Sequence, residues 1–330
     1  MTKTSKGVPI DVLVTGGAGF IGRAVVKRLL DDKRVSSVTV LDDLSNGSEK
    51  NLSEFTNHPK YDELVVGMVQ DRATLEHIFE RKQFDLCIHL GAQINVQESI
   101  DNPERAFESN VLGTYELLEQ ARLHGTRMVL VGTCMVYDVA GADGPISEIH
   151  KLKPASPYAG SKLAAENLAE SYHHAFGLPV TILRPFNTYG PFQKTNMEGG
   201  VVSIFIKRDI KGESLDIFGD GTQTRDLLYV DDCAEFIVTA AFSEKADGEV
   251  INAGTGTDVS INELAAMICN DQGRIRHVTH HHPQSEIRRL VCDHSKAERL
   301  LGWVPKTSLK DGIEKTRKWI IDNDDDEKRN

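Results

Sequence analysis

The chain has 330 residues, 40% hydrophobic and 26% charged, with a formal net charge of −11. This length suits one large α/β domain or two small ones, and the acidic balance disfavours a general nucleic-acid binder, which needs a basic surface. Five cysteines without paired spacing indicate neither disulfides nor zinc, and no apolar run approaches the about 18 residues of a membrane span, so we expect a cytoplasmic protein without a membrane partner.

The first predicted elements are a strand at residues 10–15, a glycine-rich turn and an amphipathic helix at residues 23–31. Gly17, Gly19 and Gly22 have the Gly-x-Gly-x-x-Gly spacing, and Gly16 offers a second match with glycines three apart. Such glycines let the backbone approach a pyrophosphate at the helix N-terminus. The turn therefore predicts a dinucleotide site whose candidate contacts are Gly16, Gly19, Phe20, Ile21 and Gly22.

The second predicted strand, residues 38–41, is followed by Asp42, which lies 20 residues after Gly22. An acid at this distance binds the ribose hydroxyls of NAD and repels the extra phosphate of NADP, so we predict NAD. Sheets of this kind bind cofactor at the carboxyl ends of their strands. Loops there, after strands expected at residues 38–41, 64–69 and 86–90, add the candidate cofactor contacts Asn46, Asp71, Leu90, Gly91 and Ala92.

A long helix is predicted at residues 104–124, with an apolar stripe that includes Phe107, Val111 and Tyr115. A second long helix is expected from Tyr158 to about residue 176. Two long helices of this kind could pair with those of a second copy of the chain. We therefore predict a homodimer.

Tyr158 and Lys162 lie four residues apart, which places both side chains on one face of the second long helix. An ammonium beside a phenol lowers the pKa of the phenol, and such a tyrosine can take a proton from a substrate hydroxyl while a nicotinamide takes the hydride. Thr133, just past a strand expected at residues 128–131, would share the same substrate oxygen. The Tyr-x-x-x-Lys spacing also occurs on ordinary helix surfaces, so its meaning depends on the other motifs.

Beyond residue 184 the pattern becomes less regular, with elements expected at 201–211, 215–221, 233–242, 250–252 and 261–268. We predict an α/β fold with a Rossmann-type doubly wound parallel sheet in residues 1–183. Residues 184–330 would form a smaller substrate-binding α/β region interleaved with that sheet. The charged tail at residues 322–330 is expected to fray. Three consecutive histidines at 280–282 would alternate faces in a strand, so we predict no metal site.

The chain resembles the extended short-chain dehydrogenase/reductases of the nucleotide-sugar epimerase and dehydratase group over about residues 10–321. The resemblance rests on the ordered occurrence of TGGAGFIG, HLGAQ, NVLGT, YAGSK, RPFNTYGP, QTRDLLYVDD and SKAERLLGW. It implies a nucleoside-diphosphate sugar as substrate and an NAD that stays bound and is regenerated in each catalytic cycle.

The resemblance also implies roles for individual residues. Tyr158 would deprotonate the hydroxyl on sugar carbon 4, Lys162 would hold the nicotinamide ribose, and Thr133 would bond the same sugar oxygen. Asn187 would contact the sugar or its phosphates. Arg225 would bind the diphosphate, although a structural bridge to a neighbouring aspartate is the alternative. Further candidate substrate contacts are Gln93 and Val201, together with His282 and Arg288, one of which would replace an arginine that relatives carry late in the chain.

Two departures from the family pattern affect specificity. Relatives often have an aspartate for adenine directly after the third strand's glycine, where this chain has Met68. In 4,6-dehydratases an Asp-Glu pair follows the catalytic threonine, and in 4-epimerases these positions are small and uncharged. Cys134 and Met135 match neither pattern. Met135 cannot move a proton, whereas Cys134 could act as an acid or base or serve as a buried filler.

A cysteine after the threonine also resembles enzymes that eliminate across sugar carbons 5 and 6 to give an exocyclic ene. The leading interpretation is an NAD-dependent dehydratase that oxidises carbon 4, acting on UDP-N-acetylglucosamine. A UDP-hexose or UDP-N-acetylhexosamine 4-epimerase is the alternative, since it needs only Thr133, Tyr158 and Lys162. An inactive NAD-binding regulator is the third possibility, which the intact catalytic residues disfavour.

Overall fold

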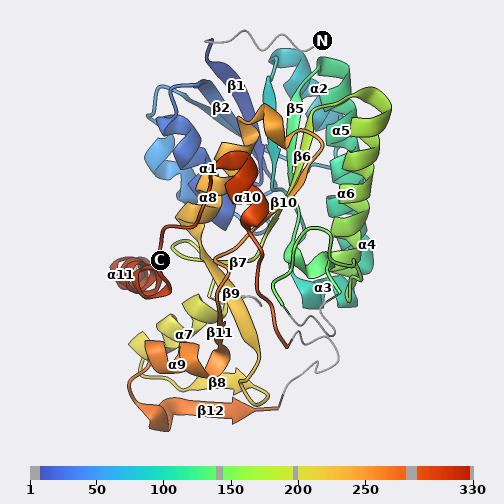
Figure 1. Ribbon diagram of the computed structural model, residues 1–330. Helices are drawn as coiled ribbons and strands as arrows, with labels where there is room; N and C mark the ends of the chain where they lie inside the picture. The colour runs from blue at the N-terminus through green and yellow to red at the C-terminus, as the bar shows by residue number, and fades with distance from the viewer. Residues whose placement is uncertain (1–7, 139–143, 196–199, 280–287, 328–330) are drawn as a thin grey trace.

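The computed structural model describes residues 8–138, 144–195, 200–279 and 288–327, and Figure 1 shows a large sheet flanked by helices. The sheet is the predicted Rossmann-type one, with seven parallel strands in the order β10-β6-β5-β4-β1-β2-β3. Their bounds are β1 Ile10–Thr15, β2 Val35–Asp42, β3 Tyr61–Val66, β4 Leu86–His89, β5 Arg127–Val131, β6 Val180–Pro185 and β10 Val250–Ala253.

Two apolar cores lie on the two faces of this sheet. Val12 and Val14 of β1 belong to one core and Leu13 to the other, because successive side chains of a strand point to opposite faces. Helices α1 (Phe20–Asp31) and α8 (Val230–Ala241) contribute to the first core. The second core is built with α2 (Arg72–Arg81), α5 (Gly113–His124) and α6 (Pro157–Phe176).

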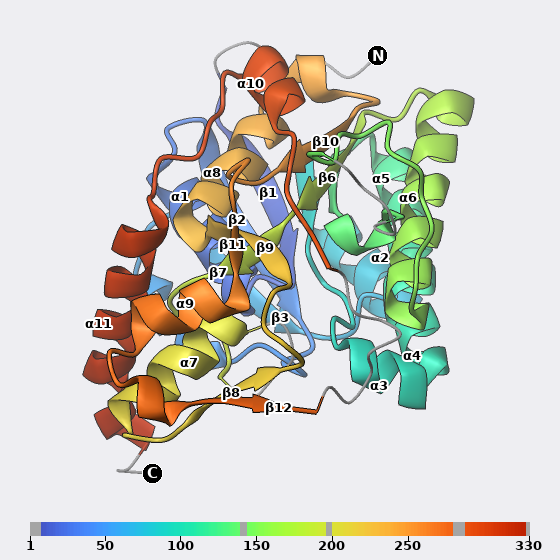
Figure 2. The same ribbon diagram turned by 60° about the horizontal axis from the view of Figure 1, so that its bottom comes forward.

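The second half of the chain contributes to both parts of the fold. Strand β10 and helix α8 belong to the large sheet and its covering layer, although both follow residue 184. The other strands form two small sheets: β8 and β12 lie at the bottom of Figures 1 and 2, and β7, β9 and β11 lie near the middle. The second half of the chain also supplies the helices around them. The bounds of these strands and helices are β7 Asn187–Tyr189, β8 Leu215–Phe218, β9 Thr224–Tyr229, β11 Asp258–Ser260, β12 Ile275–Val278, α7 Val201–Ile210, α9 Ile261–Ile268 and α11 Leu309–Glu327.

Three expected elements differ from the structure. The helix expected at 104–124 is divided into α4 (Pro103–Phe107), a π-helical turn at residues 108–112, and α5, and the π turn directs the buried Asn110 amide to the backbone of Gln93. The third strand ends at Val66, before a turn in which the Asp71 amide bonds to Met68. The charged tail is helical through Glu327 instead of frayed, because α11 continues into it.

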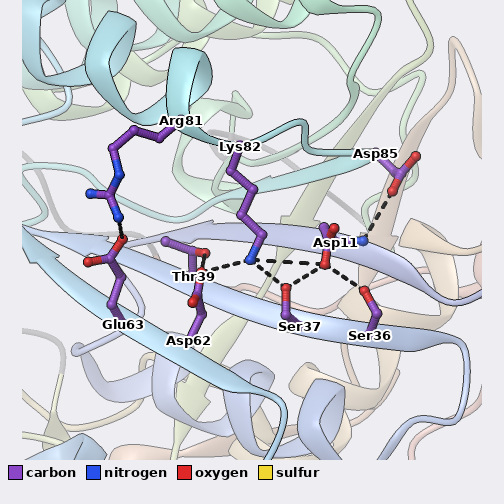
Figure 3. Close-up of polar contacts among 9 residues, drawn as sticks. All are labelled: Asp11, Ser36, Ser37, Thr39, Asp62, Glu63, Arg81, Lys82 and Asp85. Atoms are coloured by element: carbon purple, nitrogen blue, oxygen red, sulfur yellow. Dashed lines mark hydrogen bonds and ion pairs between the residues drawn. The ribbon is translucent and has the colours of Figure 1, made fainter.

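A polar cluster ties α2 to the amino-terminal part of the sheet, as Figure 3 shows. Lys82, directly after α2, donates to Ser37 Oγ at 2.6 Å and to Asp62 Oδ2 at 2.7 Å. Its Nζ also lies 4.0 Å from Asp11 Oδ1, which accepts from the hydroxyl of Ser37. One ammonium therefore lies near two carboxylates, Asp11 on β1 and Asp62 on β3, the two strands that flank β2.

Replacing Lys82 with methionine is expected to lower the free energy of unfolding by about 1–2 kcal/mol, because it leaves Asp11 and Asp62 without their shared cation. Urea denaturation measures this change. The control is Arg81→Met, which breaks the single exposed ion pair with Glu63 and should cost no more than about 0.5 kcal/mol. Equal losses in the two variants would show that the cluster adds nothing beyond an ordinary surface ion pair.

Candidate active site

A cavity of about 430 Å³ lies at the carboxyl ends of the central strands. Parallel sheets bind ligands at this edge because the loops that follow the strands converge there. Residues predicted to bind cofactor line it: Gly16, Gly19, Phe20, Ile21, Gly22, Asp42, Asn46, Leu90, Gly91 and Ala92. The catalytic candidates line it too, together with Asn187 from beyond the large sheet: Thr133, Cys134, Met135, Tyr158 and Lys162.

The glycine turn is packed so closely that it excludes side chains. A Cβ on Gly22 would lie 2.0 Å from the carbonyl oxygen of Gly16, and Gly16 itself has φ +72°. Helix α1 begins directly after Gly19, and glycine has no side chain that could cap the first amides of the helix. The first amides of α1 are thus left to an anion, and the turn fits the pyrophosphate of a dinucleotide.

Asp42 stands at the end of β2 with 7% of its surface exposed. Its Oδ2 accepts from the amide of Ala18 and its Oδ1 from the amide of Leu44, both at 2.9 Å. Burial raises the pKa of this carboxyl, and the two amides act in the opposite direction. The carboxylate is therefore fixed against the glycine turn, where the adenosine ribose of NAD would lie.

Replacing Asp42 with asparagine is expected to weaken NAD binding by about 10-fold and to reduce discrimination against NADP. The physical reason is that a hydrogen bond to a charged group contributes about 1.5–3 kcal/mol, and that the repulsion of the 2′-phosphate is lost. Calorimetric titration of the cofactor-free protein with each dinucleotide measures both effects. An unchanged ratio of the two dissociation constants would show that Asp42 does not select the cofactor.

The catalytic candidates meet where β5 and α6 come together. Thr133 precedes a short 3-10 helix (η3, Cys134–Val136) and its Oγ1 accepts from the Met135 amide at 3.2 Å. Ser156 caps α6 by accepting from the Ala159 amide at 3.2 Å, which starts the helix just before Tyr158. The Thr133 side chain lies close enough to the Tyr158 hydroxyl to lower its pKa. Two hydroxyls thus converge on one point of the cavity, as expected for a shared substrate oxygen.

The pKa expectation for Tyr158 is wrong for the ligand-free protein. Burial raises the pKa of Tyr158 to about 12, against the opposite effect of the Thr133 side chain. Burial also lowers the pKa of Lys162 to about 8. The Lys162 ammonium donates to the carbonyl oxygen of Val131 at 2.7 Å. The four-residue spacing places the two side chains on one helix face. Loss of water around them is nevertheless the largest influence on the pKa of each group.

Cys134 lines the cavity from an apolar setting, with 3% of its surface exposed. It belongs to a small buried cluster that includes Phe186, Ile146 and Cys292. Burial, reinforced by the charge of Asp226, raises the pKa of the Cys134 thiol to about 12. Burial therefore favours the neutral thiol over the thiolate at this position.

Several other candidates lie away from the main cavity. Asp71 caps α2, since its carboxylate accepts from the amide of Ala73 and from the hydroxyl of Thr74. The residues of this loop that line the cavity are Val69 and Gln70. Gln93 lines a neighbouring cavity instead, and Val201 begins α7.

The basic candidates for the diphosphate lie around β9. Arg225 donates to the carbonyl oxygen of Thr224, and the Thr224 amide bonds to the carbonyl oxygen of Arg288. The carboxylate of Asp226 accepts from the amides of Thr255, Gly256 and Cys292. His282 and its two neighbours lie outside the described residues.

Sequence reasoning missed the loop that follows β7. Phe192, Gln193 and Lys194 line the cavity, and Phe192 has φ +69°, which is unusual for a residue with a side chain. Its ring lies between the guanidinium of Arg23, 3.7 Å from the ring centre, and the ring of Trp319 at 4.7 Å. The strained Phe192 after RPFNTYGP carried no sequence signal of its own, because its partners come from distant helices.

The sequence predicted neither a metal site nor a membrane-spanning helix, and the described residues can be searched for both. These contain no group of three or more histidine, cysteine or acidic side chains placed to hold a metal ion. None of their helices combines the length and hydrophobicity that a membrane span requires.

Comparison with known proteins identifies the family. A family model described as GDP-mannose 4,6 dehydratase matches residues 13–316. The chain is an extended short-chain dehydrogenase/reductase of the nucleotide-sugar epimerase and dehydratase family. Members of this family are enzymes that use NAD, and so is this protein. The glycine turn and Asp42 fit that cofactor.

Named relatives of this short-chain dehydrogenase/reductase fall into both reaction classes. It is 38% identical over 307 residues to a UDP-glucose 4-epimerase of Mycolicibacterium smegmatis, covering 92% of this chain and 96% of the relative. It is 54% identical to Pal from Bacillus thuringiensis, with a TM-score of 0.92 over 95% of this chain and 99% of Pal. An NAD complex of a Bacillus anthracis dTDP-glucose 4,6-dehydratase matches at 29% identity and a TM-score of 0.86, covering 96% and 98% of the two chains. Family membership therefore leaves the choice between epimerisation and dehydration to the site itself.

Proposed function

We propose that this enzyme is an NAD-dependent nucleotide-sugar dehydratase that oxidises carbon 4 of UDP-N-acetylglucosamine and then removes water across carbons 5 and 6. The observation that carries the proposal is the position of Cys134, which lines the cavity directly after Thr133 together with Tyr158. The nucleotide and the sugar are inferred from the family resemblance of the sequence around Cys134.

The first step is the oxidation at carbon 4. NAD, when held by the glycine turn and Asp42, would supply the hydride acceptor for carbon 4. Tyr158, as phenolate, takes the proton of the carbon 4 hydroxyl, and Thr133 holds the same oxygen through its own hydroxyl. Lys162 supplies the positive charge that favours the phenolate once substrate and cofactor displace water.

The second step is the elimination, which the ketone at carbon 4 makes possible by acidifying carbon 5. The Cys134 thiol gives its proton to the carbon 6 hydroxyl, which departs as water. The resulting thiolate takes the proton of carbon 5, and the electron pair of that C–H bond forms the double bond between carbons 5 and 6. The thiol is regenerated, so one side chain performs the work of the acid and base pair of other dehydratases.

Simple 4-epimerisation remains the second candidate, and one observation favours it. Among the described residues that line the cavity, the only carboxylates are Asp42 and Asp43, at the predicted adenosine end. The catalytic end thus has no carboxylate base for carbon 5, and an epimerase requires none.

Product analysis separates the two candidates. The enzyme, freed of excess NAD, is incubated with UDP-N-acetylglucosamine and the nucleotide sugars are separated by ion-pair chromatography with mass detection. The proposal predicts a product that has lost water. A product of unchanged mass that elutes with UDP-N-acetylgalactosamine would reject dehydration and support epimerisation.

We also propose a homodimer formed by the helices on one side of the sheet. Large apolar side chains on α4, α5 and α6 are exposed there, with Phe107 at 58%, Leu123 at 61% and Phe176 at 57%. Large exposed apolar side chains gathered on one set of helices suit a contact with another protein. A second copy would cover these side chains with its own.

Replacing Leu123 with aspartate is therefore expected to shift the protein from dimer to monomer at micromolar concentration, because it places a charge in the apolar contact. Sedimentation velocity measures the change. The matched control is Met267→Asp, which alters an exposed apolar side chain on α9 and should leave the dimer intact. A monomeric wild-type protein would reject the proposed interface.

A further inference from the structure

A buried carboxylate lies beneath the catalytic residues, one helical turn beyond Lys162. Glu166 on α6 is 2% exposed and Arg184 on β6 is 4% exposed. Arg184 donates to a single oxygen of this carboxylate, Oε2, through Nε at 3.0 Å and through Nη2 at 2.7 Å. The ion pair is thus fully removed from water, where charged groups interact strongly.

The second oxygen of Glu166 is directed at the catalytic loop. A Cβ on Gly132 would lie 2.1 Å from Oε1, so only glycine fits between the carboxylate and the loop that carries Thr133. Among the described residues Oε1 has no side-chain or backbone hydrogen bond of ordinary geometry. Burial raises the pKa of this carboxyl, and Arg184, Lys162 and the backbone amide of Thr133 act in the opposite direction and favour the carboxylate.

A chain of hydrogen bonds on the side away from Glu166 holds the guanidinium of Arg184 in place. Its Nη1 donates to the hydroxyl of Tyr137 at 2.8 Å, and Tyr137 donates to Asn252 Oδ1 at 2.7 Å. Asn252 lies on β10 and donates to the carbonyl oxygen of Ile146 at 3.1 Å. This chain of hydrogen bonds leaves the ion pair little freedom to move, which suits a precise electrostatic role.

The charged and titratable groups around Lys162 identify the group on which Glu166 acts. On its own helix these are Tyr158 and Glu166, and on β4 the group is His89. Burial lowers the pKa of His89 to about 3, so it is neutral. Glu166 thus provides the negative charge that opposes the desolvation of the Lys162 ammonium.

We propose that Glu166 is a positioning residue of the active site, whose buried charge, held by Arg184, keeps Lys162 an ammonium during oxidation at carbon 4. The proposal goes beyond the Thr133, Tyr158 and Lys162 set and rests on the proposed chemistry at carbon 4. A neutral Lys162 could not favour the phenolate of Tyr158. Without Glu166, the Lys162 ammonium would lose its proton at a lower pH, so the reaction rate would begin to fall at a lower pH than in the wild-type enzyme.

The test uses a double variant, because Glu166→Gln alone leaves Arg184 as an unpaired buried charge and endangers folding. Glu166→Gln combined with Arg184→Gln removes both charges. The control is Arg127→Gln with Asp247→Asn, which removes another partly buried ion pair at the amino-terminal end of β5. Thermal unfolding establishes that both proteins fold.

The primary readout is the titration of Lys162 in the substrate-free enzyme, followed by NMR of [ε-¹³C]lysine and assigned with Lys162→Met. The Lys162 pKa is expected to fall by about one unit in the Glu166/Arg184 double variant and to stay unchanged in the control. An unchanged Lys162 titration in a folded double variant would overturn the proposal.

The second readout is the pH dependence of kcat. The alkaline loss of activity is expected to move to lower pH in the double variant by the same amount as the Lys162 titration, with KM nearly unchanged. If no nucleotide sugar is turned over at all, the proposed function fails, whereas the NMR titration still tests the role of Glu166. A uniform loss of kcat at every pH would reduce the pair to a structural role and overturn the inference.

Discussion

Replacing Tyr158 with phenylalanine is expected to lower kcat by about 10³- to 10⁴-fold, because it removes the group that takes the proton from the carbon 4 hydroxyl. The half-buried ring keeps its place in the cavity wall, so the protein should fold and retain NAD. Stopped-flow absorbance at 340 nm follows the transient reduction of bound NAD and measures the oxidation step directly.

The matched control is Tyr172→Phe on the same helix. Its hydroxyl donates to Glu119 at 2.6 Å, outside the cavity, so kcat should change by less than about threefold. If Tyr158→Phe reduced NAD at the wild-type rate, the general base would be another group and the assignment of the catalytic centre would be wrong.

Replacing Cys134 with alanine is expected to lower the rate of water loss by about 100-fold, the typical contribution of one positioned acid or base. Transient reduction of NAD should persist, because Thr133 and Tyr158 are unaffected. The variant would then accumulate a 4-keto sugar that keeps its carbon 6 hydroxyl, detectable by mass spectrometry after trapping with borodeuteride.

Cys292→Ala provides the control. Cys292 shares the buried apolar cluster with Cys134 but does not line the cavity, so it reports the effect of lost packing alone. Equal and small effects of the two substitutions would make Cys134 a packing residue, and the 4-epimerase would become the better account of the site.

Local sequence was sufficient to predict the glycine turn and to bring the candidate catalytic residues into one cavity. The glycines from Gly16 to Gly22, Asp42 at its fixed distance, and the four-residue spacing of Tyr158 and Lys162 are short-range patterns that the backbone converts directly into geometry. Most of the sheet follows from the same kind of signal, since its inner strands contain short apolar runs, whereas β3 begins in the charged stretch Tyr61–Glu63 and was expected too late.

The features that were missed depend on contacts between distant segments. Glu166 and Arg184 meet only because α6 packs beside β6, and the sequence shows merely an acid in a helix and a base in a strand. The pKa of Tyr158 was expected to fall because spacing reveals its neighbour Lys162. It is raised because burial, which spacing does not reveal, is the larger effect. Asp71 was assigned to the cofactor because its role as the cap of α2 depends on where β3 ends.

The most direct test of the account is a mass spectrum of the reaction with UDP-N-acetylglucosamine, with catalytic NAD, run in deuterated water. The account predicts a product that has lost water, with one solvent deuterium at carbon 5 if hydride returns to carbon 6 and none there if it returns to carbon 4. Unchanged mass without solvent deuterium, together with a new galacto-configured product, would contradict dehydration and leave Cys134 and Met135 as lining of an epimerase pocket.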